Sequence, residues 1–438
     1  MSLRDGFSPK MKPVSPRRTA IVAVLDIGTS KIVCLIARLK PQSPQETLRR
    51  RTHGVEILGI GHTEARGIKG GAVINLAEAE AAVRHAVDIA ERAASVQLES
   101  VVVSVSAGRI GSELYTATVN VAGSAITEGD VANVLTAGSY HSVRDGRLLL
   151  HSLPIGYSLD GVRGISEPRG MLAREFGVDM HAVTCDIAAA RNLMLTVERC
   201  HLAVETMVAA PYVAGLSAMA DDEADLGAAV VDMGAGTTTA AVFSSGRFIH
   251  ADSFALGGQH VTMDLARGLN TPISDAERIK TLHGSVIGGS SDDRDMISVP
   301  RAGDDEREPP QFVSRASLVR IIKPRVEEIL EMLRDRLANS PFAAEPRSRV
   351  IFTGGASQLT GLPELAANIL NRPVRIGRPL GISGLPEAAK GPAFAAATGL
   401  LVYPQAAHLE YFEPRRTRHL MTGTGYIARV GRWLRESF

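Results

Sequence analysis

The sequence has few aromatic residues, few cysteines and almost no net charge, and each shortage excludes a class of function. Aromatic residues make up 4% of the 438 residues, which leaves little for stacking nucleic-acid bases. The formal net charge is +1, so electrostatics give no reason to expect nucleic acid as a partner. The cysteines Cys34, Cys185 and Cys200 lack metal-ligand spacing. Few cysteines and no recognisable signal peptide favour a reducing cytoplasm.

Two further absences narrow the possibilities. No stretch of about 18 apolar residues occurs, so the sequence predicts no membrane-spanning helix. The Gly-x-x-x-x-Gly-Lys-Ser/Thr motif is also missing, which excludes a P-loop nucleotide site. The remaining composition, 45% hydrophobic and 22% charged, is typical of a globular protein. A chain of 438 residues is too long for one core and predicts about two to four domains.

A short glycine-bearing segment occurs once in each half of the chain. The first reads VLDIGTSK at 24–31, and the second reads VVDMGAGTT at 230–238. In both, an aspartate ends an apolar run, and glycine and hydroxyl residues precede a second apolar run, which predicts a strand, a tight turn and another strand. Glycine lets the backbone approach a ligand, and the N–H groups of such a turn can cradle a phosphate.

The two aspartates, Asp26 and Asp232, suit a hydrated Mg²⁺, an ion that prefers carboxylate and phosphate oxygens. One such segment alone is more often an ordinary hairpin. Two copies favour a nucleotide clamped between duplicated halves. A third segment, VIFTGGAS at 350–357, predicts a strand that ends in the pair Gly354-Gly355 before a helix at Leu362. The glycine pair permits close approach to a flat group, although a plain strand-to-helix turn would read the same way.

Together the three segments resemble the phosphate-1, phosphate-2 and adenosine elements of the actin/Hsp70/hexokinase ATPase superfamily. Residues 105–183 depart from that pattern, with short strand-like runs at 114–121 and 148–153 and one helix at 128–137. This stretch resembles the module of the FtsA family of bacterial cell-division proteins, with SVSAGR at 104–109 across its start, HSLP at 151–154 and PRGM at 168–171. The likeness covers roughly residues 20–403 and continues into the tail.

The resemblance implies an α/β fold, actin-like and two-lobed, with an inserted α+β module in place of the usual second subdomain. The chain is then expected to begin with a disordered leader at 1–19 and a first lobe at 20–104, 184–222 and 391–403, interrupted by the module at 105–183. The second lobe is expected at 226–256 and 350–390, with its small subdomain at 257–349. A linker at 404–424 and an amphipathic helix at 425–438 would follow. Apolar periodicity predicts helices at 76–95, 188–199, 264–268, 273–283, 319–337 and 392–402. Residues 284–313 are interpreted as a loose insertion.

The resemblance also assigns a nucleotide site. A glutamate and a lysine three residues apart on a helix hold the nucleoside in this superfamily, and Glu277 and Lys280 match them, although a solvated ion pair is the usual role of such a spacing. Mg²⁺ would be held, through water, by Asp26 and Asp232. The expected nucleotide-binding residues are Asp26, Gly28, Thr29, Ser30, Lys31, Asp232, Gly234, Ala235, Gly236, Thr237, Thr238, Gly257, Gly258, Glu277, Lys280, Gly354, Gly355 and Ala356.

One position departs from the family pattern. Many actin-like relatives carry a glutamate before a proline in the first interdomain helix, where it positions the attacking water. This chain has Ala210-Pro211 there. Because phosphoryl transfer depends on positioning and charge stabilisation, the change predicts slow hydrolysis at most, with ATP acting mainly as a structural ligand. No catalytic residue is assigned.

The last fourteen residues, 425–438, have the pattern of an amphipathic helix. At about 100° per residue the apolar side chains fall within an arc of roughly 140°, and three arginines lie on the other side. A short helix with aromatic residues opposite arginines is typical of a segment in a membrane interface, although a terminal helix docked on the core is the alternative. The apolar arc contains Tyr426, Ile427, Val430, Trp433, Leu434 and Phe438, and the arginines are Arg429, Arg432 and Arg435.

The function implied by the resemblance is a cell-division protein that binds ATP and Mg²⁺, forms filaments and tethers FtsZ at the cytoplasmic face of the membrane. Its expected partners are the FtsZ C-terminal peptide, further copies of itself, anionic lipids and later divisome membrane proteins. Arg320, Lys323 and Arg325 could meet the peptide, or simply form a solvated helix face. Alternatives are an actin-like assembly factor for pili or secretion, which would not need the amphipathic end, and a small-molecule kinase, which would need a catalytic aspartate. An Hsp70-like chaperone would need a peptide-binding domain.

Overall fold

The computed structural model describes residues 8–412, apart from residues 44, 46, 47, 49, 122, 124, 140–142, 303–309 and 346. By its internal contacts the chain divides into two compact units. The larger unit contains Met1–Leu114, Val143–Ile155 and His181–Glu410, and the smaller contains Tyr115–Ser142, Gly156–Met180 and Tyr411–Phe438.

A six-stranded sheet organises the first half of the larger unit, with the strand order β11-β6-β1-β2-β3-β19. Strand β1 pairs antiparallel with β2 and parallel with β6. Strands β1, β2 and β6 each contain a continuously buried run, at 22–25, 32–37 and 101–105, because their sequences are mostly apolar there, as expected for a sheet covered on both faces. Their bounds are β1 Ala20–Ile27, β2 Lys31–Pro41, β3 His53–Glu64, β6 Ser100–Val105, β11 Ala203–Ala209 and β19 Ile382–Ser383.

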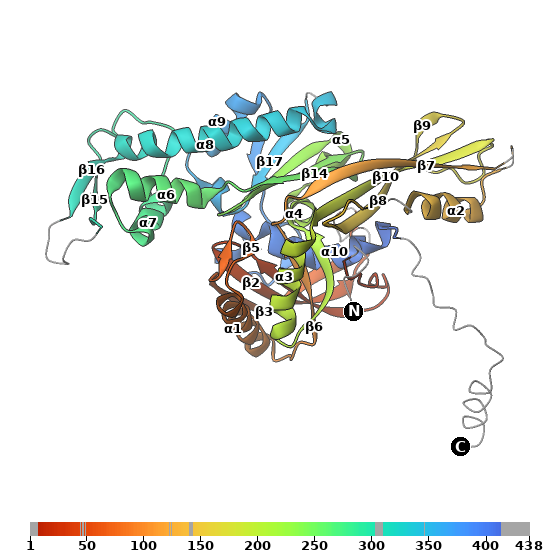
Figure 1. The fold of residues 1–438 in the computed structure, drawn as a ribbon, viewed down its shortest axis with the longest axis horizontal. Helices are drawn as coiled ribbons and strands as arrows, with labels where there is room; N and C mark the ends of the chain where they lie inside the picture. Colours follow the sequence, from red (N-terminus) through yellow and green to blue (C-terminus); the bar gives the residue numbers. More distant parts are fainter. Residues whose placement is uncertain are drawn as a thin grey trace, which may run out of the picture. The chain divides into compact units, whose positions relative to one another are not determined.

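Two amphipathic helices, α1 (Leu76–Ala94) and α3 (Ile187–Arg199), pack beside this sheet (Figure 1). Helix α1 begins after Asn75, whose side chain accepts a hydrogen bond from the Glu78 amide, an N-cap that satisfies one unpaired backbone donor. The helix lies close to β3 because β3 carries glycine at the contact. A Cβ atom on Gly61 would lie 1.8 Å from the Ala86 carbonyl oxygen.

A second, five-stranded sheet repeats the pattern of the first, with the order β14-β13-β12-β17-β18. Strand β12 pairs antiparallel with β13 and parallel with β17, as β1 does with β2 and β6. The duplicated glycine segments therefore belong to duplicated supersecondary units. The bounds are β12 Ala228–Met233, β13 Thr238–Ser244, β14 Arg247–Phe254, β17 Arg349–Thr353 and β18 Val374–Ile376.

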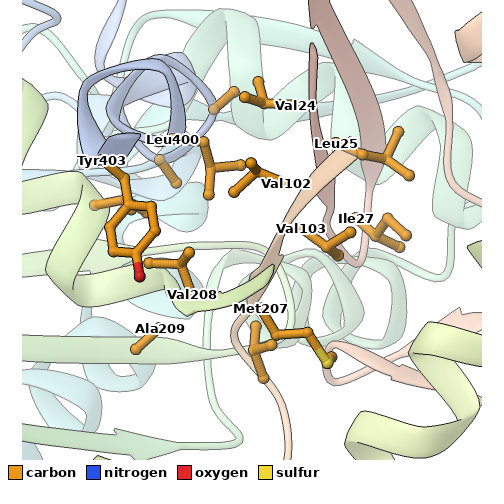
Figure 2. Close-up of a cluster of buried hydrophobic side chains, with 14 of the residues drawn as sticks. Val24, Leu25, Ile27, Val102, Val103, Met207, Val208, Ala209, Leu400 and Tyr403 are labelled. Carbon is orange, nitrogen blue, oxygen red and sulfur yellow. The ribbon is translucent and has the colours of Figure 1, made fainter. Parts of the chain in front are cut away.

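Two helices that are apolar all round, α4 (Ala210–Ala218) and α10 (Ala395–Ala406), lie inside the larger unit. Every residue of α10 is buried, and Gly399 allows close contact because a Cβ there would lie 1.8 Å from the Val213 carbonyl oxygen. Figure 2 shows Leu400 and Tyr403 of α10 in one cluster with Val102 and Val208. Residues from β1, β6, β11 and α10 thus share one core.

The second half also contains a group of helices, α6 (Gly258–Leu269), α7 (Ile273–His283) and α8 (Arg315–Ala338), which pack on one another (Figure 1). Helix α6 begins at Gly258, so the predicted helix over 264–268 was too short. The glycine pair at its start hides the helical periodicity of its first turn. The predicted loose insertion at 284–313 was wrong in part, because β15 (Met296–Val299) and β16 (Gln311–Ser314) form an antiparallel ribbon that buries Val299.

The smaller unit has its own core, built from one helix and parts of one sheet. The sheet order is β7-β10-β8-β9, and strands β7, β8 and β10 contribute residues to both units. Phe176, Val178 and Met180 of β10 pack with Val131 and Val134 of α2. The bounds are β7 Gly111–Asn120, α2 Glu128–Ser139, β8 Arg147–Leu159, β9 Val162–Ile165 and β10 Glu175–Asp186.

The other short elements complete the described chain. They are β4 Ile68–Lys69, β5 Ala72–Val73, α5 Asp221–Leu226, α9 Leu362–Leu370, and the 3₁₀ turns Pro341–Ala344, Gly355–Gln358, Glu387–Ala389, Pro392–Phe394 and Ala407–Leu409. None of the helices in this described part of the chain combines the length and the apolar character needed to cross a membrane.

Candidate functional site

The first glycine segment forms a tight turn between β1 and β2, here named the first turn (Asp26–Lys31). The Gly28 amide donates to the Lys31 carbonyl, with 3.0 Å between nitrogen and oxygen, and closes the turn. A Cβ on Gly28 would lie 2.9 Å from that carbonyl oxygen, so a larger residue would distort the closure. The Asp26 carboxylate accepts a hydrogen bond from the Ser104 hydroxyl on β6. The strand beside β1 therefore fixes the orientation of Asp26.

The second glycine segment forms the equivalent turn between β12 and β13, the second turn (Asp232–Thr238). The Gly234 amide donates to the Thr237 carbonyl over 2.9 Å, which is the same closing bond at the same spacing. The two turns touch, because a Cβ on Gly236 would lie 2.4 Å from the Thr29 hydroxyl oxygen. Glycine at 236 lets the second turn approach the Thr29 side chain this closely.

The third segment (Thr353–Ala356) lies against the second turn. Gly354 has φ 86° and ψ 163°, a conformation that residues other than glycine rarely adopt. A Cβ there would lie 2.3 Å from an Asp232 carboxylate oxygen. The Gly354 amide and the Thr353 hydroxyl both donate to the Pro392 carbonyl, over 3.0 Å and 2.8 Å. Three segments far apart in the sequence thus meet at one place.

Three charged side chains, Asp26, Asp232 and Lys31, lie at this meeting point and interact electrostatically. Burial raises the pKa of Asp26, while the Ser104 hydrogen bond and Lys31 oppose the shift. Burial and the neighbouring Asp26 raise the pKa of Asp232 to about 7. Burial lowers the pKa of Lys31, against the attraction of the two carboxylates.

Lys31 is also held by the segment that precedes α10. Its ammonium donates to the Ala393 carbonyl over 2.6 Å and lies 3.7 Å from the centre of the Phe394 ring. Sequence reasoning missed Ser104 and Phe394, because neither belongs to a glycine segment and only the strand pairing and the position of α10 bring them here. Ser104 opens the SVSAGR stretch that carries the family resemblance, but nothing in that stretch indicates a contact with Asp26.

The predicted pair Glu277 and Lys280 lies on α7, close to the glycine pair that starts α6. Lys280 donates to Glu277 over 2.6 Å, to the Thr262 hydroxyl over 2.8 Å and to the Gly258 carbonyl over 3.1 Å. Gly258 also lies beside the third segment, since a Cβ on it would be 2.9 Å from the Ala356 Cβ. Lys280 is therefore packed into this corner, whereas the Glu277 side chain remains half exposed, at 53%.

The amides at the start of α6 bind the second turn. Gly258 donates to the Gly234 carbonyl over 2.9 Å, and Gln259 donates to the Ala235 carbonyl over 2.8 Å. A Cβ on Gly257 would lie 2.5 Å from the Gly234 carbonyl oxygen. Gly257 and Gly258 thus pack against the backbone of the second turn and stabilise it.

The remaining predicted residues differ in their exposure. Ser30 and Gly355 are exposed, whereas Thr237 and Thr238 are buried, and the Thr238 hydroxyl donates to the Leu256 carbonyl over 2.8 Å. Ala210 begins the buried helix α4. The predicted membrane residues Tyr426, Ile427, Arg429, Val430, Arg432, Trp433, Leu434, Arg435 and Phe438 lie outside the described residues.

The donor set at this place defines what it can hold. Two carboxylates occur at this place. The described part of the chain contains no cluster of three or more metal-ligating side chains. That set is too small to cage a metal alone, but suits Mg²⁺, which takes one or two carboxylates together with water and phosphate oxygens. A separate cavity of about 420 Å³, lined by Tyr212, Leu216, Phe248 and Arg247 among others, contains none of the predicted nucleotide residues.

Comparison with protein families matches two models to this chain. The model described as "Cell division protein FtsA" matches residues 229–399, and "SHS2 domain inserted in FTSA" matches residues 107–184. The FtsA of Agrobacterium fabrum is 53% identical over 437 residues, covering 98% of both chains. The chain belongs to the FtsA family of cell division proteins. The FtsA of Escherichia coli is 32% identical over 425 residues, covering 95% of this chain and 98% of its own.

Solved structures confirm the predicted actin-like fold of this FtsA-family chain. The PilM-PilN type IV pilus biogenesis complex matches with a TM-score of 0.59 at 16% identity, covering 88% of this chain and 98% of that one. MreB5 of Spiroplasma citri bound to ADP matches with a TM-score of 0.52 at 13% identity, covering 90% and 98%. The inserted module predicted from the sequence is likewise confirmed, by the SHS2 match.

Proposed function

We propose that this FtsA-family chain binds MgATP where the first turn, the second turn and the third segment meet. The observation that carries the proposal is this convergence of three remote glycine segments on Asp26, Asp232 and Lys31. Asp26 and Asp232 would hold Mg²⁺ through water, and the ammonium of Lys31 would neutralise phosphate charge. The fold agrees with this, since MreB5 of Spiroplasma citri was solved with ADP.

The cation and the nucleotide would relieve a charge problem that the site has without them. Asp26 and Asp232 are half-buried near each other, and Lys31 balances one of the two carboxylates. A divalent cation would supply the missing positive charge, and the phosphates would supply oxygen ligands. Glu277 and Lys280, at the corner beside Ala356, are proposed to contact the nucleoside.

Hydrolysis is proposed to be slow. Ala210 and Pro211 begin α4, where many actin-like proteins have a glutamate, and neither residue can orient a water molecule through its side chain. Bound ATP would then act chiefly by holding the two halves of the larger unit together. A single-turnover assay that measures phosphate release from bound ATP would test this, and fast release would contradict it.

The chain is further proposed to assemble into filaments at the cytoplasmic face of the cell membrane, to tether FtsZ there and to help recruit later divisome proteins. Residues 425–438 would bind the membrane, with Trp433 and Phe438 in the interface and the arginines facing anionic headgroups. Each basic residue near such a surface contributes about 1 kcal/mol.

Co-sedimentation with anionic liposomes tests the tether. The full chain should pellet with liposomes, and a chain ending at Thr424 should remain soluble while still binding ATP. Trp433→Glu places a charge in the apolar arc and should weaken pelleting, whereas Ala428→Glu adds the same charge outside the arc and should weaken it less. Equal pelleting of the full and shortened chains would contradict membrane binding by the tail.

The FtsZ peptide is proposed to contact the small subdomain at 257–349. Two of the cations considered for it are already paired, Arg325 with Asp264 over 2.6 Å and Lys323 with Glu327 over 3.7 Å. The β15–β16 ribbon instead exposes Phe312, at 64%. Fluorescence anisotropy with a labelled FtsZ C-terminal peptide should show weaker binding to Phe312→Ser than to Leu195→Ser, a change at an exposed leucine on α3. Equal affinities would exclude the ribbon as the contact.

A further inference from the structure

The residues that precede β1 are held against the larger unit by backbone hydrogen bonds. Ser8–Arg18 are here named the N-terminal strap. The Ser8 amide donates to the Leu149 carbonyl on β8 over 3.2 Å. The Val14 amide donates to the Pro404 carbonyl on α10 over 3.3 Å, and the Val14 side chain packs against the apolar core that contains the first sheet. The strap therefore has a defined place beside β8 and the end of α10.

The middle of the strap meets Glu410, the last residue of the larger unit. The Lys10 ammonium lies 3.6 Å from one Glu410 carboxylate oxygen. The other oxygen lies 2.7 Å from His151 Nδ1 and accepts a hydrogen bond from the Tyr403 hydroxyl over 2.9 Å. With these partners and a side chain only 2% exposed, Glu410 is fixed in place. The strap thus lies beside the point from which the chain continues to residues 425–438.

A β-turn at the end of the strap carries two arginines. The Arg18 amide donates to the Ser15 carbonyl over 3.0 Å, and Pro16 stands second in the turn, where its fixed φ is favoured. The ring of His53 holds the Arg18 carbonyl as well, with Nε2 3.1 Å from the oxygen. The backbone of Arg17 and Arg18 is therefore fixed, while both side chains are exposed.

The strap carries positive charge without a paired carboxylate. Lys12, Arg17 and Arg18 are exposed, and their side chains form no hydrogen bond or ion pair with the residues that the structure describes. The strap contains no acidic residue, and Glu410 beside it is already paired with Lys10. A single exposed cation is ordinarily just solvated. Three cations on a fixed strap without acids form a local positive surface, although the net charge of the whole chain is only +1.

We propose that the strap is a second membrane contact, in which Lys12, Arg17 and Arg18 bind anionic lipid headgroups. The inference rests on the membrane tether proposed for residues 425–438 and adds a contact outside that segment. The place of the strap favours this partner, because the strap adjoins the residue from which the chain continues to the proposed membrane segment. Fixed and exposed cations also suit a flat anionic surface, which attracts basic residues that come within a Debye length of it.

A contact of this kind would set how the larger unit faces the membrane. Residues 411–424 separate Glu410 from the proposed membrane segment and reach at most about 50 Å when extended, so the tail alone leaves the orientation of the unit open. The strap would turn the end of α10 toward the lipid. Its three charges are too few to anchor the chain alone, but linkage to a bound tail raises their effective concentration at the surface.

Co-sedimentation of the full chain with mixed vesicles of phosphatidylglycerol and phosphatidylcholine tests the proposal. The variant Lys12→Gln/Arg17→Gln/Arg18→Gln should bind at least about tenfold more weakly than the unsubstituted chain, because each basic residue near an anionic surface strengthens binding about fivefold. On vesicles of phosphatidylcholine alone, the two chains should bind equally, since the apolar arc of the tail is unchanged. The difference on mixed vesicles should shrink at high salt, which screens exposed charges.

Two further variants separate the position of the charges from their number. Arg294→Gln/Arg301→Gln/Arg347→Gln is the matched control, because these arginines are also exposed, have no side-chain partner among the described residues and belong to the second half of the chain. It removes the same charge and should leave binding nearly unchanged. Lys12→Arg/Arg17→Lys/Arg18→Lys keeps the charge of the strap and should bind like the unsubstituted chain.

Equal affinity of the strap variant and the unsubstituted chain for mixed vesicles would overturn the proposal, and so would an equal loss in the matched control. Weaker binding of the labelled FtsZ peptide to the strap variant, at unchanged lipid affinity, would also overturn it and assign the strap to a peptide. Failure of the unsubstituted chain to bind mixed vesicles would instead overturn the membrane tether itself, and this inference with it. Far-UV circular dichroism and thermal unfolding show whether each variant is folded.

Discussion

His181 should make the protein lose stability as the pH falls from 7 to 5. The ring is fully buried, and its Nδ1 lies 2.8 Å from the Phe248 carbonyl oxygen. Because a carbonyl oxygen only accepts, Nδ1 carries the proton in the neutral ring. Nε2 lies 2.8 Å from the Ser112 hydroxyl oxygen. Burial, together with the smaller effect of the nearby His250 and His151 rings, lowers the pKa of His181 to about 3, against the opposing hydrogen bond to Phe248.

The magnitude follows from the difference in proton binding between the two states. In the unfolded chain a histidine titrates near pH 6.5, so between about pH 3 and 6.5 the unfolded state binds the proton and the folded state does not. The stability is therefore fully present above pH 6.5 and declines as the pH falls through this window. Linkage gives a loss of about 2 kcal/mol between pH 7 and pH 5 from this group.

Urea unfolding at pH 7 and pH 5, followed by circular dichroism, measures this loss. His181→Asn retains a donor for the Phe248 carbonyl but does not titrate. The drop in its free energy of unfolding between pH 7 and pH 5 should therefore be about 2 kcal/mol smaller than that of the unsubstituted chain, whatever the absolute stability of the variant. His283→Asn replaces an exposed histidine on α7 and should retain the full loss. The reasoning is refuted if the loss in His181→Asn equals that of the unsubstituted chain.

Three further predictions concern the nucleotide site and the core. Asp232→Asn should stabilise the nucleotide-free protein at pH 8 in EDTA by up to about 4 kcal/mol, because it removes a half-buried carboxylate whose raised pKa of about 7 makes ionisation costly. The same change should abolish stabilisation by MgATP in thermal unfolding. Gly354→Ala should cost about 1–3 kcal/mol and weaken nucleotide binding, whereas Gly164→Ala, with the same φ of 86° but nothing within 4 Å, should leave nucleotide binding unchanged. Leu400→Ala, in the core shown in Figure 2, should lower the free energy of unfolding in urea by about 2–5 kcal/mol. Leu226 is 78% exposed, and Leu226→Ala should change that free energy by less than about 0.5 kcal/mol. A free energy for Leu400→Ala near that of Leu226→Ala would contradict the packing described.

Much of the fold could be predicted because it follows from local patterns. Apolar runs ending in Asp26 and Asp232 specify buried strands, and the glycines after them specify tight turns, so β1–β2 and β12–β13 follow from short stretches of sequence. Helix α1 is equally local, since its apolar period and the cap at Asn75 are both written in consecutive residues. The prediction failed at the start of α6, where two glycines conceal the period.

Tertiary structure alone decided which residues meet. Thr29 and Gly236 are far apart in the sequence, as are Asp26 and Ser104, and each pair is brought together only by strand order and by the packing of the two halves. The sequence by itself determined the turns and strands, because a residue's backbone preferences and burial pattern depend on its neighbours in the chain. The N-terminal strap gained its place beside Pro404 and Glu410 only on folding, because contacts between distant segments depend on the whole packed core.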